Sequence, residues 1–182
     1  MFNQFDTAQR LFFSLKFTAM QQQWLLPYQR VLHQQYPAAK AVAVDNLHLT
    51  LFFLGQVTAE QKQLLNAAAK SIAMPSFELT LDTVASFSKP KILYLAPSAV
   101  ARELLVLQRQ VADICKAMGF NEIHDGYRPH VTLLRHASVP QEFTQQVLPL
   151  SIVVSEFALY QSLNIDGAVR YLPLHTFSSR EG

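Results

Sequence analysis

The sequence predicts a mixed α/β or α+β fold built from two similar lobes. Segments with strand and helix patterns are interspersed along the whole chain, in the order strand, helix, strand, helix, two strands, helix and three strands. The segment HLTLFFLG at His48 also recurs loosely as HVTLLRHA at His130, 82 residues later in a chain of 182. No linker or low-complexity run divides the sequence, so we expect residues 1–182 to form a single bilobal domain with one His-x-Thr-x segment in each lobe.

The first half of the chain has the patterns of strands and two helices. Thr58 and Gln61 resemble a capping box, which marks the start of the second helix. Pro27 interrupts the first helical pattern, so an alternative is that this helix begins at the proline. The predicted elements are an aromatic strand over Arg10 to Phe17, a helix over Ala19 to Tyr36, two extended pieces over Ala41 to Leu54 that Gly55 stops, and a helix from Thr58 to about Met74.

The second half adds strands and the most regular helical pattern. Between Arg102 and Met118 the apolar positions step by three and four residues, and Gly119 follows where a helix C-cap belongs. Strands are predicted over Phe77 to Val84, Lys91 to Ala96, the residues around His130 and Thr132, Ser151 to Ser162, and Arg170 to His175.

Composition and charge narrow the class of protein. Hydrophobic residues make up 50% of the chain and charged residues 15%, which excludes a disordered protein. The formal net charge of +2 is too small to indicate nonspecific binding to nucleic acid, so an RNA or DNA partner has to be recognised locally. The sole cysteine, Cys115, falls in a helical pattern that favours a buried thiol. The first residues, with Asp6 among them, lack the pattern of a secretory signal, and no apolar run is long enough to span a membrane, so we expect a cytoplasmic protein.

Two His-x-Thr patterns give the chain its candidate chemistry. Side chains alternate between the faces of a strand, so His48 and Thr50 point one way while the leucines beside them point into a core. His130 and Thr132 repeat this arrangement, with imidazole and hydroxyl about 7 Å apart along each strand. If the two lobes pack with these faces opposed, a cleft with two histidines and two threonines results.

Such a cleft suits the chemistry of phosphoesters. One neutral imidazole can take a proton from a nucleophile while the other, protonated, gives a proton to the leaving oxygen. The threonine hydroxyls can donate hydrogen bonds to phosphoryl oxygens. No HExxH, CxxC or Asp-rich calcium loop occurs in the sequence, and the scheme requires neither metal nor cofactor. The alternative is that each histidine hydrogen-bonds locally at a strand end and each threonine is an ordinary strand residue.

The two patterns and their flanks resemble a known family. DNLHLTLFFLG at Asp45 and RPHVTLLR at Arg128 are similar to the paired signatures of the 2H phosphoesterases. The segments RLFFSL at Arg10, FELTLDTVASFSKPKILYLAP at Phe77 and EFALYQSLNIDGAVRYLPL at Glu156 resemble the bacterial and archaeal branch known as RNA 2′,3′-cyclic phosphodiesterases, historically 2′-5′ RNA ligases or LigT-like proteins. The resemblance extends over nearly the whole chain.

The resemblance implies a bilobal α+β fold that hydrolyses RNA 2′,3′-cyclic phosphate ends to 2′-phosphates and that also joins tRNA halves through a reversible 2′-5′ linkage. Carried over, it makes His48 the general acid and His130 the general base, although the symmetry of the signatures leaves the reverse assignment open. Thr50 and Thr132 become the phosphate-binding hydroxyls. Arg135 matches the family arginine that steadies the phosphate, but strict alternation from His130 puts it on the opposite face, so it reaches the cleft only if the strand bends or ends after Leu133.

Several expectations of the resemblance remain open. Phe12 lies in the aromatic first strand and could stack on a nucleobase, with core packing as the alternative. Ser86 and Tyr94 stand where the family usually has Gly and often Trp, and because both lie outside the signatures we expect them to affect loop shape and substrate contacts. The remaining histidines, His33, His124, His136 and His175, match no motif and are expected to face solvent or to be incidental, although His124 and His136 flank the second signature closely enough to shift its electrostatics.

Three functions are therefore weighed. The first is hydrolysis of cyclic phosphate RNA ends by a monomer without metal or cofactor. The second is the same two-histidine chemistry on another small cyclic or 2′-5′ phosphodiester. The third is a noncatalytic module that binds RNA ends, although a pure phosphate binder is better served by Arg or Lys than by two imidazoles.

Overall fold

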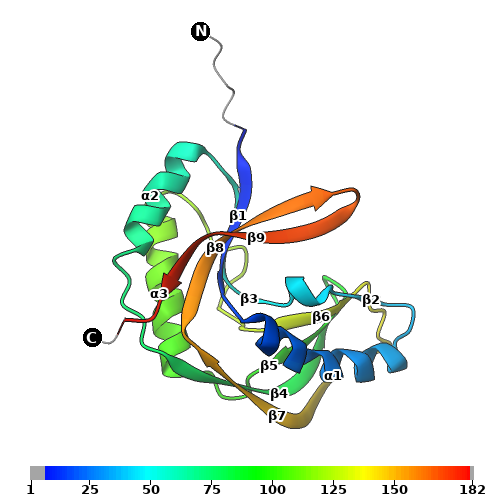
Figure 1. Cartoon of the computed structure of the whole chain (residues 1–182). Helices are drawn as coiled ribbons and strands as arrows, with labels where there is room; N and C mark the ends of the chain where they lie inside the picture. Colours follow the sequence, from blue (N-terminus) through cyan, green and yellow to red (C-terminus); the bar gives the residue numbers. More distant parts are fainter. Residues whose placement is uncertain (1–6, 181–182) are drawn as a thin grey trace.

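The computed structural model describes residues 7–180, so Asp6, on which the expectation of no secretory signal partly rests, lies outside the described residues. Three α-helices, a 3-10 turn and nine strands follow one another along these residues (Figure 1). Their order is β1 (Gln9–Leu15), α1 (Ala19–Gln35), β2 (Lys40–Ala41), η1 (Val44–Asn46), β3 (Leu49–Val57), α2 (Ala59–Ala69), β4 (Phe77–Phe87), β5 (Ile92–Ala96), α3 (Arg102–Ala117), β6 (Val131–Arg135), β7 (Thr144–Val154), β8 (Glu156–Ile165) and β9 (Ala168–Ser178).

All strands belong to one antiparallel sheet in the order β7-β4-β5-β6-β3-β1-β8-β9, with β2 paired to β6. The sheet has two halves that meet where β3 and β6 begin. At this join Leu49 of β3 is the partner of Val131 of β6. Each His-x-Thr segment therefore belongs to a different half, and the two segments come together in the middle of the sheet.

The helices divide between the two halves. Helix α3 packs on β3 and on α2, whereas α1 packs on β6, β2 and η1. Figure 1 shows α2 and α3 side by side at one end of the molecule and α1 at the other. Because helices and antiparallel strands form separate layers, the prediction of an α+β fold is confirmed.

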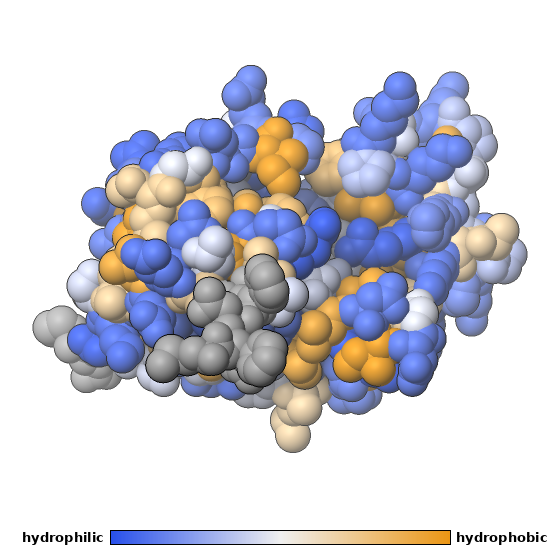
Figure 2. Space-filling view, turned by 90° about the horizontal axis from the view of Figure 1, so that it is seen from above, coloured by the Kyte–Doolittle hydropathy of each residue, from blue (hydrophilic) through white to orange (hydrophobic). Residues whose placement is uncertain are grey.

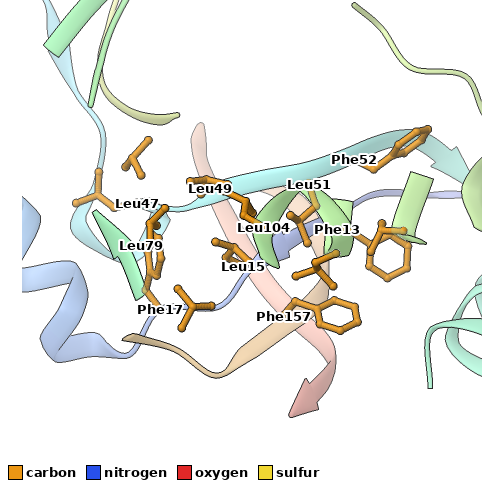
Figure 3. Close-up of a cluster of buried hydrophobic side chains, with 14 of the residues drawn as sticks. Phe13, Leu15, Phe17, Leu47, Leu49, Leu51, Phe52, Leu79, Leu104 and Phe157 are labelled. Carbon is orange, nitrogen blue, oxygen red and sulfur yellow. The ribbon is translucent and has the colours of Figure 1, made fainter. Parts of the chain in front are cut away.

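The core is one continuous cluster of buried side chains that spans both halves. Figure 3 shows part of it, where residues of β1 and β3 meet Leu104 of α3, Phe157 of β8 and Leu79 of β4. Phe13, Phe157 and Leu49 are each exposed by 1% or less. The aromatic run that favoured a buried first strand is thus explained by its central place in the sheet.

The predicted starts of the helices agree with the structure better than their predicted ends. Thr18 and Thr58 both form capping boxes, and the Thr58 oxygen accepts a hydrogen bond from the Gln61 amide. The alternative that the first helix begins at Pro27 is wrong, because α1 starts at Ala19 and continues through this exposed proline. Helix α2 ends at Ala69 rather than near Met74, and α3 ends one residue before Met118.

Two strand predictions are corrected. The strand predicted over residues 151–162 is broken at Ser155, because β7 pairs with β4 whereas β8 pairs with β1 in the other half of the sheet. Gly55 does not stop its strand: β3 continues to Val57. Gly55 has a φ of 77°. It lies beside an irregularity in the pairing of β1 with β3, where a left-handed backbone favours glycine.

The surface is mainly polar on the side that Figure 2 shows. Hydrophilic residues cover most of the face in Figure 2, with smaller hydrophobic areas between them. Cys115 is fully buried, and burial raises the pKa of its thiol to about 12, as expected for a cysteine inside an amphipathic helix. None of the helices formed by residues 7–180 is long and apolar enough to cross a membrane.

Candidate active site

The pair Leu49 and Val131 sets the direction of the candidate catalytic side chains. Both of these residues are completely buried beneath the sheet. Since neighbouring residues of a strand point to opposite faces, the residues on either side of the pair face the other way. These are His48 and Thr50 in one half, and His130 and Thr132 in the other, and all four are partly buried. Both signatures therefore share one face at the join.

Each histidine is oriented by the backbone of its own segment. The Nδ1 atom of His48 lies 2.7 Å from the carbonyl oxygen of Asn46, and Nδ1 of His130 lies 2.7 Å from the carbonyl oxygen of Arg128. A carbonyl oxygen only accepts hydrogen bonds, so Nδ1 carries the proton in both rings. In the neutral form, Nε2 is then the unprotonated nitrogen that can accept a proton.

Thr50 directly contacts Nε2 of the histidine in its own signature. Its Oγ1 atom lies 2.9 Å from Nε2 of His48, so the separation of about 7 Å expected from the strand rise is wrong for this imidazole and hydroxyl, because the two side chains lean toward each other. When the ring is neutral, the hydroxyl donates to Nε2; when the ring is protonated, Nε2 donates to the hydroxyl. Tyr127 holds the same segment from the other half, because its hydroxyl donates to the Thr50 carbonyl oxygen over 2.9 Å. The loop that carries His130 is thereby tied to β3.

Aromatic rings surround both imidazoles. His48 lies beside Phe12, with ring centroids 5.1 Å apart, and beside Tyr171, with centroids 4.9 Å apart. His130 lies beside Phe87 and Tyr94, with centroids 5.4 Å and 5.2 Å away. Tyr94, which was expected to affect loop shape and substrate contacts, packs its ring directly on the histidine of the second signature. Tyr171 and Phe87 belong to no local sequence motif. Their positions beside the histidines follow only from the pairing of distant strands.

This packing lowers the pKa of both histidines. Burial, the largest cause, lowers the pKa of His48 from 6.5 to about 4, against the hydrogen bond to Asn46, which favours the protonated ring. Burial also lowers the pKa of His130. The positive charge of Arg135 lowers both values further, and His124 adds a smaller effect on His130. Both rings of the free protein are therefore mainly neutral at pH 7.

Arg135 lies on the side of the histidines, which strict alternation did not allow. The register between β5 and β6 shifts, so that Leu93 is opposite Leu134 while Tyr94 is opposite Thr132. Leu133 and Leu134 are consequently both buried, and the alternation reverses after them. This irregularity supplies the bend on which the predicted contact of Arg135 with the cleft depends. The guanidinium is exposed and close enough for its charge to act on both histidines.

Phe12 is enclosed rather than presented to solvent. Only 3% of it is exposed. Tyr160 stacks on its ring at 5.4 Å between centroids, and the edge of Tyr171 lies at 5.1 Å. In this packing, Phe12 forms the wall against which His48 rests. Ser86, the other departure from the family pattern, accepts a hydrogen bond from the Phe143 amide and thereby holds the start of β7.

Among residues 7–180, no cluster of three or more His, Cys, Asp or Glu side chains has the arrangement of a metal site. Of the other histidines, His124 is near enough for its charge to lower the pKa of His130, whereas two are placed apart from the join. His33 lies in α1, with its Nε2 atom 3.0 Å from the Ala39 carbonyl oxygen, and His175 is exposed on β9. Two surface hollows also lie elsewhere, one beside Arg102 and Glu103 and the other beside Lys70 and Arg180.

A sheet that presents two His-x-Thr pairs on one face, one pair from each half, defines a protein of the two-histidine phosphoesterase class. Residues 21–166 match the family model of the 2′-5′ RNA ligase superfamily. The chain belongs to this superfamily, which confirms the resemblance found in the sequence.

Individual relatives agree with this assignment. A protein of Escherichia coli (strain K12) named RNA 2′,3′-cyclic phosphodiesterase is 35% identical over 166 residues, covering 91% of this chain and 94% of that protein. A protein of the same name from Archaeoglobus fulgidus is 26% identical over 147 residues, covering 76% and 82%. The crystal structure of E. coli LigT complexed with 3′-AMP superposes with a TM-score of 0.86 at 33% identity, covering 96% of this chain and 99% of that one.

Proposed function

We propose that this protein is an enzyme that hydrolyses RNA 2′,3′-cyclic phosphate ends to 2′-phosphates. The observation that carries the proposal is the antiparallel pair Leu49 and Val131, which sets two equivalent His-x-Thr segments on one face with their Nδ1 atoms occupied. Two imidazoles whose Nε2 atoms are unprotonated in the neutral rings form the acid and base that in-line displacement at phosphorus needs, and Nε2 of His48 contacts the Thr50 hydroxyl. The relatives named RNA 2′,3′-cyclic phosphodiesterase support the choice of substrate.

In the proposed reaction, Nε2 of His130 takes a proton from water as the water oxygen attacks phosphorus. The bond from phosphorus to O3′ breaks, and protonated His48 gives its proton to O3′, which leaves a 2′-phosphate and a 3′-hydroxyl. The hydroxyls of Thr50 and Thr132 donate to the phosphoryl oxygens, and the Arg135 guanidinium stabilises the charge that develops on them.

The lowered pKa values impose a condition on this scheme. Because both rings of the free protein are mainly neutral at pH 7, the proton that His48 donates has to enter with the substrate. The negative charge of a bound phosphodiester raises the pKa of both nearby rings and provides the reason for that uptake. Phe12 then acts by packing against His48 rather than by stacking on a base.

The same step can join two RNA ends. If the 5′-hydroxyl of a second RNA replaces water, His130 takes its proton, O3′ leaves with the proton of His48, and a 2′-5′ phosphodiester forms. The exchange is reversible because one phosphodiester bond is broken and another is formed. It requires no nucleotide, because the cyclic ester supplies the energy. We propose tRNA halves as substrates of this kind. We further propose a cytoplasmic monomer, supported by a site assembled from one chain and by the buried free thiol of Cys115.

A substrate panel tests the choice of RNA. We expect an oligonucleotide with a 2′,3′-cyclic phosphate end to be hydrolysed with a higher kcat/KM than a 3′,5′-cyclic nucleotide or a 2′-5′ oligoadenylate. Faster hydrolysis of either small phosphodiester would mean that the enzyme acts on a small cyclic or 2′-5′ phosphodiester rather than on RNA ends. Recovery of every substrate unchanged would leave a binding module.

The leaving group tests which histidine is the acid. A cyclic substrate with sulfur in place of the bridging O3′ releases a thiolate, which needs no protonation. We expect this substrate to restore the rate of His48→Ala but not that of His130→Ala. Restoration of His130→Ala alone would reverse the two roles.

A further inference from the structure

The 3-10 turn that precedes the first signature is bound to the β8–β9 hairpin through one buried side chain. Asn46 is 7% exposed. Its Nδ2 atom donates to the Val169 carbonyl oxygen over 2.8 Å, and its Oδ1 atom accepts from the Tyr171 amide over 3.3 Å. Both polar ends of this side chain are therefore held by the backbone of β9.

The backbone of the same residue holds His48. The Asn46 carbonyl oxygen accepts the proton of His48 Nδ1 over 2.7 Å, and the Asn46 amide donates to the Ala43 carbonyl oxygen over 2.8 Å. The position of this carbonyl determines whether Nδ1 remains the protonated nitrogen and Nε2 the reactive one. The side chain of Asn46 thus anchors the group that fixes the tautomer of His48.

The second signature is held in a different way. The carbonyl that accepts from His130 belongs to Arg128, whose side chain is exposed. Pro129 follows it and is buried, so the restricted φ of proline and the hydroxyl contact of Tyr127 constrain this segment. The two histidines therefore have equivalent Nδ1 contacts but unequal anchors.

The β8–β9 hairpin is a suitable support for this anchor. Its turn at Asp166 and Gly167 has positive φ angles of 52° and 81°, the pattern of a tight two-residue hairpin turn. Figure 1 shows the hairpin extending past η1 from the edge of the sheet. Tyr171 contributes twice, because its amide donates to Asn46 and its ring packs on His48.

We infer that Asn46 is a positioning residue for His48. Through its contacts to the β8–β9 hairpin, Asn46 fixes the orientation of the His48 imidazole. This inference rests on the proposed function for its effect on catalysis, but its geometric content is independent of any substrate. Asn46→Ala removes both contacts to β9 and leaves the carbonyl of residue 46 held by the turn alone.

Nuclear magnetic resonance of histidine labelled with ¹⁵N tests the inference directly, because it reads which ring nitrogen carries the proton. In Asn46→Ala at neutral pH, we expect His48 to change from the pure Nδ1-protonated form to a mixture of tautomers, while His130 stays unchanged as an internal control. We expect kcat for cyclic phosphate RNA to fall about 10-fold to 100-fold, with a smaller change in KM.

Asn66 provides a matched control, since it is also a buried asparagine but lies in α2. Asn66→Ala should leave both histidine signals and kcat unchanged. Asn46→Ser, a smaller change whose hydroxyl is too short to replace both contacts, serves if the alanine variant does not fold. An unchanged His48 tautomer in a folded Asn46 variant would overturn the inference. If the tautomer changes in the variant but the unsubstituted protein has no phosphodiesterase activity, the result would count against the proposed function alone.

Discussion

Leu49 of β3 and Val131 of β6 are antiparallel partners at the join of the two half-sheets, and neither side chain is exposed. Because the side-chain period of a strand is two, this pairing sends both signatures to the opposite face. A slip of one residue on either side would bury one histidine beneath the sheet and expose an apolar side chain. Hydrophobic burial therefore fixes the register on which the proposed acid-base pair depends.

Removal of either imidazole should stop turnover without unfolding the protein. We expect His48→Ala and His130→Ala each to lower kcat by at least ~10²-fold, the usual contribution of a general acid or base. Steady-state rates on cyclic phosphate RNA and circular dichroism of the same samples check this. His175→Ala, at an exposed histidine of β9, is the control and should keep its activity. A folded His48 or His130 variant with full turnover would contradict the assignment.

The pH optimum of kcat/KM should lie at acidic pH. The proposed reaction needs one proton shared by two histidines whose pKa values are both below 6.5 in the free protein. We therefore expect kcat/KM to be highest below pH 6.5 and to fall about tenfold for each unit above pH 7. Because the bound phosphodiester raises both values, kcat should stay level to a higher pH than kcat/KM. A kcat/KM that rises between pH 7 and pH 8 would disagree with neutral rings in the free protein.

Arg135 should act on both substrate charge and histidine pKa. In Arg135→Ala, we expect kcat/KM to fall about 10-fold to 100-fold because a donor to the phosphoryl oxygens is lost. Its positive charge lowers the pKa of both histidines, so its removal should also shift the kcat/KM profile to higher pH. Arg135→Lys should restore the profile more fully than the rate, since lysine lacks the planar fork of arginine. Arg109→Ala, on the exposed side of α3, is the control.

Tyr127 should matter for stability and rate together. In Tyr127→Phe, the Thr50 carbonyl oxygen loses its 2.9 Å donor, which should lower the free energy of unfolding by about 1 kcal/mol. Loss of the tie between the His130 loop and β3 should also lower kcat by roughly 10-fold. Denaturant unfolding and steady-state kinetics measure the two effects. Tyr36→Phe, at another partly buried tyrosine, should leave kcat unchanged.

The signatures could be found in the sequence because their information is local. Alternation around His48 and His130 depends only on the next residues along each strand, and the capping boxes at Thr18 and Thr58 are equally short-range. The resemblance to the 2H phosphoesterases then indicated the reaction and the roles of these residues.

Features that depend on pairing between distant strands could not be found in this way. The irregularity beside Leu133 and Leu134 that turns Arg135 toward the site arises from the register with β5. The break at Ser155 exists because consecutive strands join different halves of the sheet. Phe87 and Tyr171 reach the histidines from β4 and β9, and no spacing in the sequence relates them to either signature.

Product analysis of a single reaction tests the central claim most directly. An RNA oligonucleotide that ends in a 2′,3′-cyclic phosphate is incubated with the purified protein in excess EDTA, and the 2′- and 3′-phosphate products are separated. We expect complete conversion to the 2′-phosphate at a rate that EDTA does not change, because histidines alone transfer the protons. Formation of the 3′-phosphate would mean that O2′ leaves instead of O3′, and loss of the reaction in EDTA would contradict a mechanism that rests on His48 and His130 without metal.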